Sequence, residues 1–203
     1  MTHSKLPAAF FQRPDPLQIA RALLGKHLYT DIDGVITAGR IVETEAYRHE
    51  GDDSLTMHLQ RKPHQAKGLH LPGGHAYIYT VYNRYALFNI TTHDAQHPDA
   101  VLIRAIEPTV GVDEMLRRRG LNEAKRTLTA GPGVLSQALG ITPALTGQLV
   151  TGEVLWFEDH GEEVAAAAIV ASARVGLEYA GVEAAGLPWR FRVKDSKWTS
   201  PAK

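Results

Sequence analysis

Two glutamates and a tyrosine stand at alternate positions, Glu43, Glu45 and Tyr47, in a segment that begins at Gly39 and is rich in β-branched residues. This composition predicts a strand, in which alternate side chains lie on one face. The Cα atoms of Glu43 and Glu45 would then lie roughly 6 to 7 Å apart. If both carboxylates are shielded from water, the charge of one can raise the pKa of the other, and such a carboxylate can serve as a general base. A strand with one face in solvent shows the same alternation, so this pattern alone leaves both interpretations open.

Four tyrosines follow within nine residues and predict an aromatic β-hairpin. Its strands are expected over residues 76–81 and 86–91. Tyr77 has the residue type of a half-buried strand position. Tyr82 stands beside Asn83 at the turn, where polar residues are usual. An exposed aromatic side chain of this kind can enter a stack of DNA bases.

Charged residues interrupt two further strand candidates. Arg104 lies within the apolar run 101–106, so its guanidinium must either pair with a strand glutamate or face a polar cavity in an active site. Arg190, Arg192 and Lys194 alternate with apolar residues near the C-terminus and predict a strand with one basic face. The sequence thus predicts a local cationic stripe in a protein of zero formal net charge.

Two loop segments could also carry function. Gly131-Pro132-Gly133 opens a helix expected over 134–139, and free amides at a helix start attract phosphate, although the same residues make an ordinary turn. Residues 48–75 are expected to form a long, mobile, partly basic loop that is rich in histidine. The spacing of these histidines matches no helical zinc motif, so no metal site is expected there.

One domain must position these groups. A chain of 203 residues with 44% hydrophobic residues can bury a proper core, and the absence of cysteine excludes disulfides, zinc-thiolate sites and cysteine nucleophiles. Residues 1–14 are expected to form a flexible arm, too short in apolar length for a signal peptide or a membrane span, and a cytoplasmic location is expected. Residues 15–203 are expected to form a single α+β domain with a mainly antiparallel sheet and flanking helices. Its other expected elements are a helix from the N-cap Asp15, a hairpin turning at Asp33-Gly34, a helix over 112–119, and strands over 153–157, 164–173 and 187–193.

The chain resembles the alkyladenine (3-methyladenine) DNA glycosylase family. The resemblance runs in family order from about residue 17 to the end. It implies one domain with a curved antiparallel sheet and the excision of alkylated or deaminated purines from double-stranded DNA. This reaction needs no metal or organic cofactor, and a monomer is expected because nothing in the sequence suggests an oligomer. The matching strings are Gly39 to Tyr47 (GRIVETEAY), Gly74 to Asn89 (GHAYIYTVYNRYALFN), Val101 to Pro108 (VLIRAIEP), Gly131 to Ile141 (GPGVLSQALGI), Arg174-Val175-Gly176, and Leu187 to Trp198.

The resemblance also implies roles for residues at matching positions. Glu45 would be the general base that activates water, and Arg104 would help to hold the reacting site. Tyr47 and Tyr79 would stack on the flipped base, and Tyr82 would fill the gap that the base leaves in the duplex. The base pocket would comprise Tyr47, His58, Tyr77, Tyr79, Asn89 and Leu102, with Asn89 against the exocyclic amino group of guanine, and Arg84, Gly131 and Gly133 would contact the DNA backbone.

The sequence departs from the family pattern between Tyr47 and the hairpin. Family members usually carry Gly-Pro-x-Asp there, with a histidine soon after, whereas this chain has a longer stretch before His58. Asp53 and His64 are therefore alternatives to His58. Arg84 stands where family members often have an apolar residue, and these changes bear most on the range of substrates.

Three other interpretations compete with a glycosylase. A carbohydrate hydrolase could use Glu43 and Glu45, but such a pair must flank its substrate rather than share one strand face. A non-catalytic protein that binds damaged DNA would keep the pocket and lack the chemistry. A histidine loop that binds a metal ion is the third.

Overall fold

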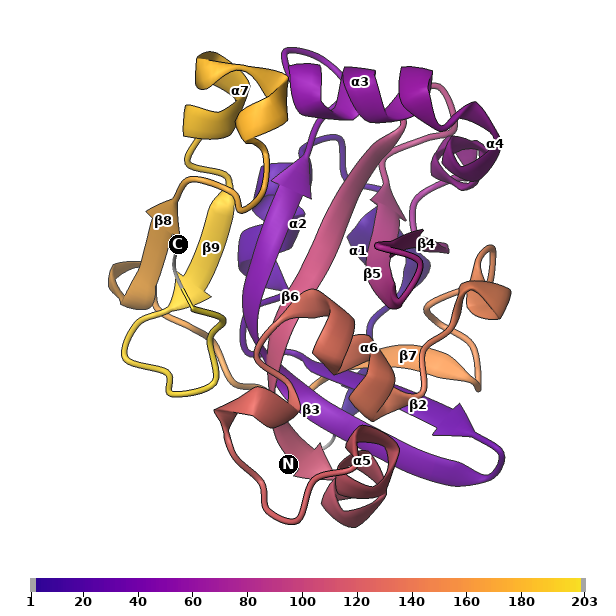
Figure 1. The fold of residues 1–203 in the computed structure, drawn as a ribbon, viewed down its shortest axis with the longest axis vertical. Helices are drawn as coiled ribbons and strands as arrows, with labels where there is room; N and C mark the ends of the chain where they lie inside the picture. The colour runs from indigo at the N-terminus through magenta and orange to yellow at the C-terminus, as the bar shows by residue number, and fades with distance from the viewer. Residues whose placement is uncertain (1–2, 202–203) are drawn as a thin grey trace.

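The computed structural model describes residues 3–201, and these form one α+β domain built on a nine-stranded antiparallel sheet, which confirms the predicted fold class. The strand order is β1-β7-β2-β3-β6-β5-β4, and β9 pairs with both β3 and β8 beside this path. Figure 1 shows the sheet crossing the middle of the molecule, with α6 in front of it and α2 behind. The strands are β1 (Ser4–Lys5), β2 (His27–Ile32), β3 (Val35–Tyr47), β4 (Ala76–Val81), β5 (Tyr85–Thr92), β6 (Asp99–Val110), β7 (Leu155–Asp159), β8 (Ile169–Ser172) and β9 (Arg190–Val193).

The α-helices cover the sheet and one of its ends. α2 packs on β3 and β6, α6 packs on β5 and β6, and α5 packs on α6. Figure 1 shows α3 across the end of the sheet where β3 finishes. The α-helices are α1 (Ala8–Phe11), α2 (Pro16–Ala22), α3 (Asp53–Arg61), α4 (Pro63–Ala66), α5 (Val112–Arg119), α6 (Pro132–Leu139) and α7 (Val182–Gly186). The short 3₁₀ helices are η1 (Lys67–His70), η2 (Arg126–Leu128), η3 (Pro143–Leu145), η4 (Ala166–Ala168) and η5 (Glu178–Ala180). None of the helices among residues 3–201 has the length and apolar character to cross a bilayer.

β3 is the strand that joins the two halves of the sheet. Its first half pairs with β2 through a turn at Asp33 (φ 56°) and Gly34 (φ 78°), the left-handed conformations that a tight hairpin requires. Its second half pairs with β9, and β6 follows it along the other edge. Register shifts between Ala38 and Thr44 bend the strand, and Gly39 permits the close approach, since a Cβ there would meet Ile106 at 2.6 Å.

The structure corrects two predictions about loops. Residues 4–11 do not form a flexible arm, because β1 pairs with β7 and the side chain of Phe11 is fully buried; Met1 and Thr2 lie outside the described residues. The segment 48–75 is largely helical, with α3, α4 and η1 in succession. Asp52 starts α3 by accepting a hydrogen bond from the Ser54 backbone N–H (3.1 Å), and Leu55 buries its inner face.

Several predicted elements are confirmed, with shifted ends. The first hairpin turns at the predicted Asp33-Gly34, α2 begins after the predicted N-cap Asp15, and α5 spans the predicted residues. β6 is longer than predicted and continues through Pro108 to Val110. The hairpin of β4 and β5 has its turn at Tyr82 (φ 52°) and Asn83 (φ 50°), and Tyr82 is 91% exposed at the tip.

Candidate active site

Glu43, Glu45 and Arg104 form a buried ion-pair cluster between β3 and β6. Arg104 donates from Nε to Oε1 of Glu43 (3.0 Å), and its Nη1 lies 3.2 Å from Oε1 of Glu45. Both carboxylates are fully buried, and Arg104 is 6% exposed. The predicted pairing of Arg104 with a strand glutamate is therefore confirmed, and it involves both glutamates.

Protein donors surround Glu43. Arg190 donates from Nε at 2.6 Å, and Ser200 donates from its backbone N–H (2.5 Å) and its hydroxyl (2.7 Å). Burial by itself would raise the pKa of Glu43, but the charges of Arg104 and Arg190 and the Ser200 hydrogen bonds lower it below its usual value. The expectation that paired glutamates raise each other's pKa is thus wrong for Glu43.

The hydrogen bond from Arg190 to Glu43 corrects the prediction that β9 has a basic face in solvent. Arg190 is 2% exposed and points inward to Glu43, so it cannot belong to a solvent-facing cationic stripe. A buried guanidinium requires a partner, and Glu43 provides it.

Glu45 has a different set of partners. Its Oε1 accepts the backbone N–H of Val175 (2.9 Å), and its Oε2 accepts the hydroxyl of Tyr47 (2.8 Å). A carboxylate offers about four acceptor sites, so Oε2 keeps capacity for another donor beside Tyr47.

The segment that supplies the Val175 amide is itself anchored. Arg174 is buried and donates to both oxygens of Asp52, with Nη1 to Oδ2 at 2.5 Å and Nη2 to Oδ1 at 2.8 Å. Because Asp52 also caps α3, this pair ties Val175 to the helix that carries His58. Sequence reasoning missed Asp52 and gave Arg174 no role, although Arg174-Val175-Gly176 was among the matching strings.

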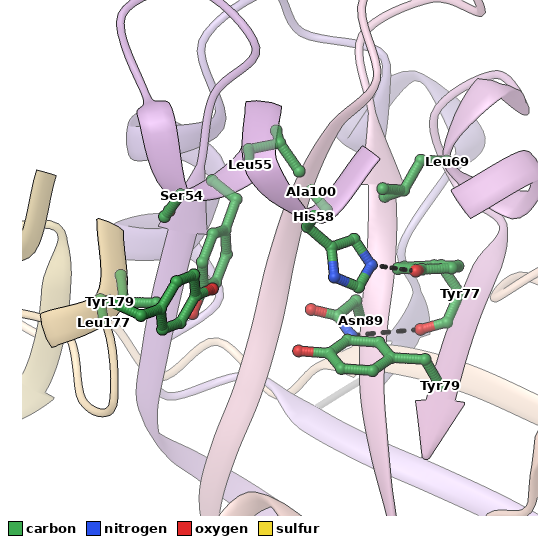
Figure 2. Close-up of a pocket in the computed structure, with 11 residues that line it drawn as sticks. Ser54, Leu55, His58, Leu69, Tyr77, Tyr79, Asn89, Ala100, Leu177 and Tyr179 are labelled. Atoms are coloured by element: carbon green, nitrogen blue, oxygen red, sulfur yellow. Dashed lines mark hydrogen bonds between the residues drawn. The ribbon is translucent and has the colours of Figure 1, made fainter. Parts of the chain in front are cut away.

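An inner pocket opens beside this cluster, between β4, β5, α3 and η5 (Figure 2). Figure 2 shows His58, Tyr77 and Tyr79 on one side of the pocket and Leu177 with Tyr179 on the other. The His58 and Tyr79 rings are 4.8 Å apart, and His58 Nε2 lies 2.5 Å from the Tyr77 hydroxyl. The lining residues are Tyr47, Ser54, Leu55, His58, Leu69, Tyr77, Tyr79, Asn89, Ala100, Leu177 and Tyr179.

The polar groups of this pocket are neutral near pH 7. Burial, with a smaller contribution from the charge of Lys62, lowers the pKa of His58 to about 4. Burial raises the pKa of Tyr47, Tyr77 and Tyr79 above the usual value for a phenol. Asn89 donates its amide hydrogens to the carbonyls of Tyr77 (3.3 Å) and Leu87 (3.2 Å), and Figure 2 marks the contact with Tyr77 by a dashed line. The side-chain oxygen of Asn89 is therefore the atom left to face a ligand.

A larger outer groove adjoins the inner pocket and shares Tyr47, His58 and Tyr79 with it. The hairpin tip borders the groove, and the start of α6 forms another of its walls. Gly133 lies in that wall. A glycine is needed at this position because a Cβ there would meet the Tyr85 side chain at 2.7 Å. The lining residues include Arg61, Lys62, Tyr82, Leu102, Arg104, Gly131, Gly133, Val175, Gly176 and Tyr179.

The structure brings most of the predicted site residues together. Five of the six predicted pocket residues line the inner pocket, and Leu102 lines the outer groove with Arg104. Glu45 lines neither space, since it lies behind Tyr47 and Arg104. The inner-pocket residues from the prediction are Tyr47, His58, Tyr77, Tyr79 and Asn89.

Other candidates lie outside these spaces. Arg84 is exposed and borders a separate hollow on the far side of the hairpin. Asp53 and His64, the alternatives to His58, are exposed and line neither space. Leu177 and Tyr179, which do line the pocket, lie within three residues after Gly176 and had no signal beyond that motif.

Comparisons with known proteins find a matching family model and similar sequences. A family model described as methylpurine-DNA glycosylase (MPG) matches residues 9–197. A relative from Chlamydia felis is 40% identical over 195 residues, which cover 95% of this chain and 98% of the relative. Relatives from Shouchella clausii (39% identical, covering 92% of this chain and 90% of the relative) and Chlorobaculum parvum (40% identical, covering 98% and 92%) carry the same name, "Putative 3-methyladenine DNA glycosylase".

Proposed function

This chain belongs to the methylpurine-DNA glycosylase family, and we propose that it is a monofunctional DNA glycosylase that excises alkylated or deaminated purines from double-stranded DNA. The substrates would be of the 3-methyladenine, 7-methylguanine, hypoxanthine and ethenoadenine class. The observation that carries the proposal is the buried carboxylate of Glu45, which accepts a hydrogen bond from Tyr47. Tyr47 lines an aromatic pocket that opens into a groove.

The inner pocket suits a flipped purine. Tyr47 and Tyr79 offer aromatic faces for stacking, and an electron-rich face attracts a cationic alkylpurine. The low pKa of His58 keeps this side chain uncharged at pH 7, so it does not repel such a base. Asn89 presents its amide oxygen, an acceptor that would meet the exocyclic amino group of a guanine derivative.

The outer groove suits the duplex. Tyr82 at the exposed hairpin tip would enter the gap that the flipped nucleotide leaves, which offsets part of the unstacking cost of a few kcal/mol. Arg61 and Lys62 place positive charge on the rim. The amides at the start of α6, beside Gly131 and Gly133, would contact a backbone phosphate.

Glu45 would act as the general base. Cleavage of the N-glycosidic bond passes through an oxocarbenium-like state, which a nearby carboxylate stabilises while it orients and deprotonates water. Val175 and Arg104 hold Oε1, so Oε2 is the oxygen that would accept from water. The Tyr47 hydroxyl now occupies part of that approach, and water would reach Oε2 when this hydroxyl turns aside or shares the oxygen.

The test is single-turnover excision from duplexes that each carry one hypoxanthine, one ethenoadenine or random alkylpurines. We expect wild-type protein to leave abasic sites and Glu45→Gln protein to leave none above background. Glu163→Gln serves as the matched control, because Glu163 is exposed and lines neither the inner pocket nor the outer groove. Excision that Glu45→Gln leaves unchanged would contradict the role of Glu45.

The same experiment separates an enzyme from a binding protein. A non-catalytic protein would bind the damaged duplex with a strong salt dependence and yield no abasic product. Abasic product above the level without enzyme would exclude that alternative.

A further inference from the structure

The hairpin of β4 and β5 separates the outer groove from a hollow on its opposite face. Alternate side chains of a strand lie on opposite faces, so Tyr85 lines the groove while its neighbours Arg84 and Ala86 line the hollow. The rest of the hollow comes from α5, the end of α6 and the segment that follows α6. The groove and the hollow are thus the two sides of one hairpin, with Tyr82 exposed at its tip.

Positive charge lines the hollow, and none of its lining residues in the described part of the chain is acidic. Arg118 is one of its two arginines, and Glu114 already accepts a hydrogen bond from it (2.7 Å). The other is Arg84, which is exposed and whose guanidinium has neither a hydrogen bond nor an ion pair with any of residues 3–201. Arg84 therefore offers the hollow a positive charge that no carboxylate among these residues neutralises.

Neighbouring groups hold this charge in place. The Arg84 backbone N–H donates to the Val81 carbonyl (3.1 Å) and closes the turn, and the guanidinium carbon lies 5.2 Å from the centroid of the Tyr85 ring. A cation over an aromatic face is stabilised without losing its charge. The guanidinium is therefore positioned beside the hollow and remains able to bind an anion.

Two further features favour an anion in the hollow. Arg119 donates to Oε1 of Gln137, a lining residue, so the amide nitrogen of Gln137 is left as a donor. Burial lowers the pKa of Arg119, and the charge of Arg84 lowers it further. Since both hydrogen bonds of Arg119 go to uncharged groups, Gln137 and the Thr127 carbonyl, an anion at the hollow would relieve the repulsion between the two arginines.

The hairpin is too narrow to hold a duplex on one face only. Paired strands lie about 4.8 Å apart, whereas the major groove of B-DNA alone is about 12 Å wide. A duplex that takes Tyr82 into its base stack therefore extends over both faces of the hairpin. One face leads into the groove and the inner pocket, so the other face, with Arg84 and the hollow, meets the part of the duplex that stays stacked.

We propose that the hollow binds a backbone phosphate of the duplex, on the side of Tyr82 away from the flipped nucleotide, with Arg84 as its charged ligand. The inference rests on the proposed function, since it takes Tyr82 as the residue that enters the base stack. Guanidinium donors make strong hydrogen bonds to phosphate oxygens. Phosphate contacts fix the register of a protein on its duplex, so this contact would align the damaged base with the pocket. The backbone contact predicted for Arg84 thereby receives a place that the sequence did not indicate.

The experiment measures binding of the full-length chain to a duplex that carries a tetrahydrofuran abasic analogue, which has no base to excise. Fluorescence anisotropy gives the association constant over roughly 50 to 200 mM KCl. Loss of one phosphate contact should reduce the slope of log K against log [KCl] by about 0.9 in Arg84→Gln. Arg84→Lys should keep the slope, because it keeps the charge.

Arg117→Gln is the matched control. It changes the net charge as Arg84→Gln does, but Arg117 is exposed, pairs with Glu114 (2.6 Å) and lines neither the inner pocket, the outer groove nor the hollow. Its slope should equal that of the wild type. Duplexes with one neutral methylphosphonate at a time then locate the contact. We expect one position at which the wild type loses affinity and Arg84→Gln does not.

An unchanged slope in Arg84→Gln, an equal loss of slope in Arg117→Gln, or a methylphosphonate scan to which wild type and Arg84→Gln respond alike would each overturn the proposal. Excision is measured separately on duplexes with damaged purines. A wild type that excises, together with an unchanged slope in Arg84→Gln, refutes the phosphate site alone. Absence of abasic product refutes the glycosylase activity and leaves the binding measurement valid.

Discussion

Glu43 and Glu45 stand two residues apart on the same strand, are both fully buried and share Arg104, yet their surroundings differ in one decisive respect. Apart from the shared Arg104, the partners of Glu43 are Arg190 and Ser200, which are buried and line neither the inner pocket nor the outer groove. Glu45 instead accepts a hydrogen bond from Tyr47, a residue that lines the pocket. A buried carboxylate whose other partners all lie in the interior stabilises the fold, whereas one that is in contact with the wall of the inner pocket can take part in chemistry.

Arg104 connects the two centres. It lines the outer groove and contacts both carboxylates, and their charges raise its pKa above the usual value for arginine despite its burial. The Glu43 centre therefore holds the guanidinium that also positions Glu45. Because Arg104 couples the two centres, the roles of Glu43 and Glu45 must be tested with substitutions that nearly keep the side-chain volume.

The largest expected effect is on catalysis at the Glu45 centre. Replacing Glu45 with Gln keeps the shape but removes the base, so we expect the single-turnover excision rate to fall roughly 10²- to 10⁴-fold. The thermal unfolding midpoint should change little by comparison, and the measurement is excision and thermal unfolding on the same preparation. A variant that unfolds but excises normally when folded would reverse the roles that we assign to the two centres.

The distinction between these centres could not be predicted from the sequence. Alternation along the strand placed both glutamates together, but it gave no information about Arg190 and Ser200, which reach Glu43 from 147 and 157 residues away. Such pairings depend on the tertiary fold. Family resemblance supplied the choice of Glu45, and local periodicity alone would have left both glutamates as candidates.

Local signals predicted local structure well. The turn at Asp33-Gly34 and the N-cap Asp15 gave the first hairpin and α2, because each depends on neighbouring residues only. α3 was missed because it lies in a polar segment, 48–75, that is rich in histidine, and its stability comes from the Asp52 cap and the contact of Asp52 with Arg174, which is distant in sequence. β1 was missed because a two-residue strand has no periodicity to detect.

The next largest effect is on stability at the Glu43 centre. Glu43→Gln leaves Arg190 buried without its counter-charge, so we expect a loss of about 3 kcal/mol in the free energy of unfolding. For a chain of this length, that loss corresponds to a midpoint roughly 6 to 12 °C lower in thermal unfolding. The folded fraction should still excise at a rate well above that of Glu45→Gln. A stable Glu43→Gln protein with no activity would show that Glu43 also acts in the chemistry.

A milder pair of substitutions removes one hydroxyl from each centre. Ser200→Ala deletes a hydrogen bond to the charged Glu43, so we expect about 1.5 kcal/mol lower stability and an unchanged excision rate. Tyr47→Phe deletes the hydroxyl on Glu45 but keeps the ring, so we expect the excision rate to change by about tenfold or less with little loss of stability. Chemical denaturation and single-turnover kinetics measure the two effects. If Ser200→Ala slows excision more than Tyr47→Phe does, the separation of the centres is wrong.

The smallest expected effect is on the pH dependence of stability, because the pocket residue His58 and the interior residue Glu43 titrate in different pH ranges. The pKa of His58 is lowered from 6.5 to about 4, so the unfolded chain binds a proton there before the folded protein does. Its contribution to stability is therefore present above pH 6.5 and is lost as the pH falls from about 6.5 to about 4. The lowered pKa of Glu43 acts in a more acidic range, since that contribution is lost as the pH falls below the usual glutamate value near 4.5. In thermal unfolding scanned from pH 7 to pH 3, His58→Gln should flatten the upper range by about 1 kcal/mol per pH unit, or about 2 to 4 °C per pH unit. Glu43→Gln should flatten only the lower range, and a loss of the upper slope in Glu43→Gln would show that the pocket histidine and the interior carboxylate are not independent.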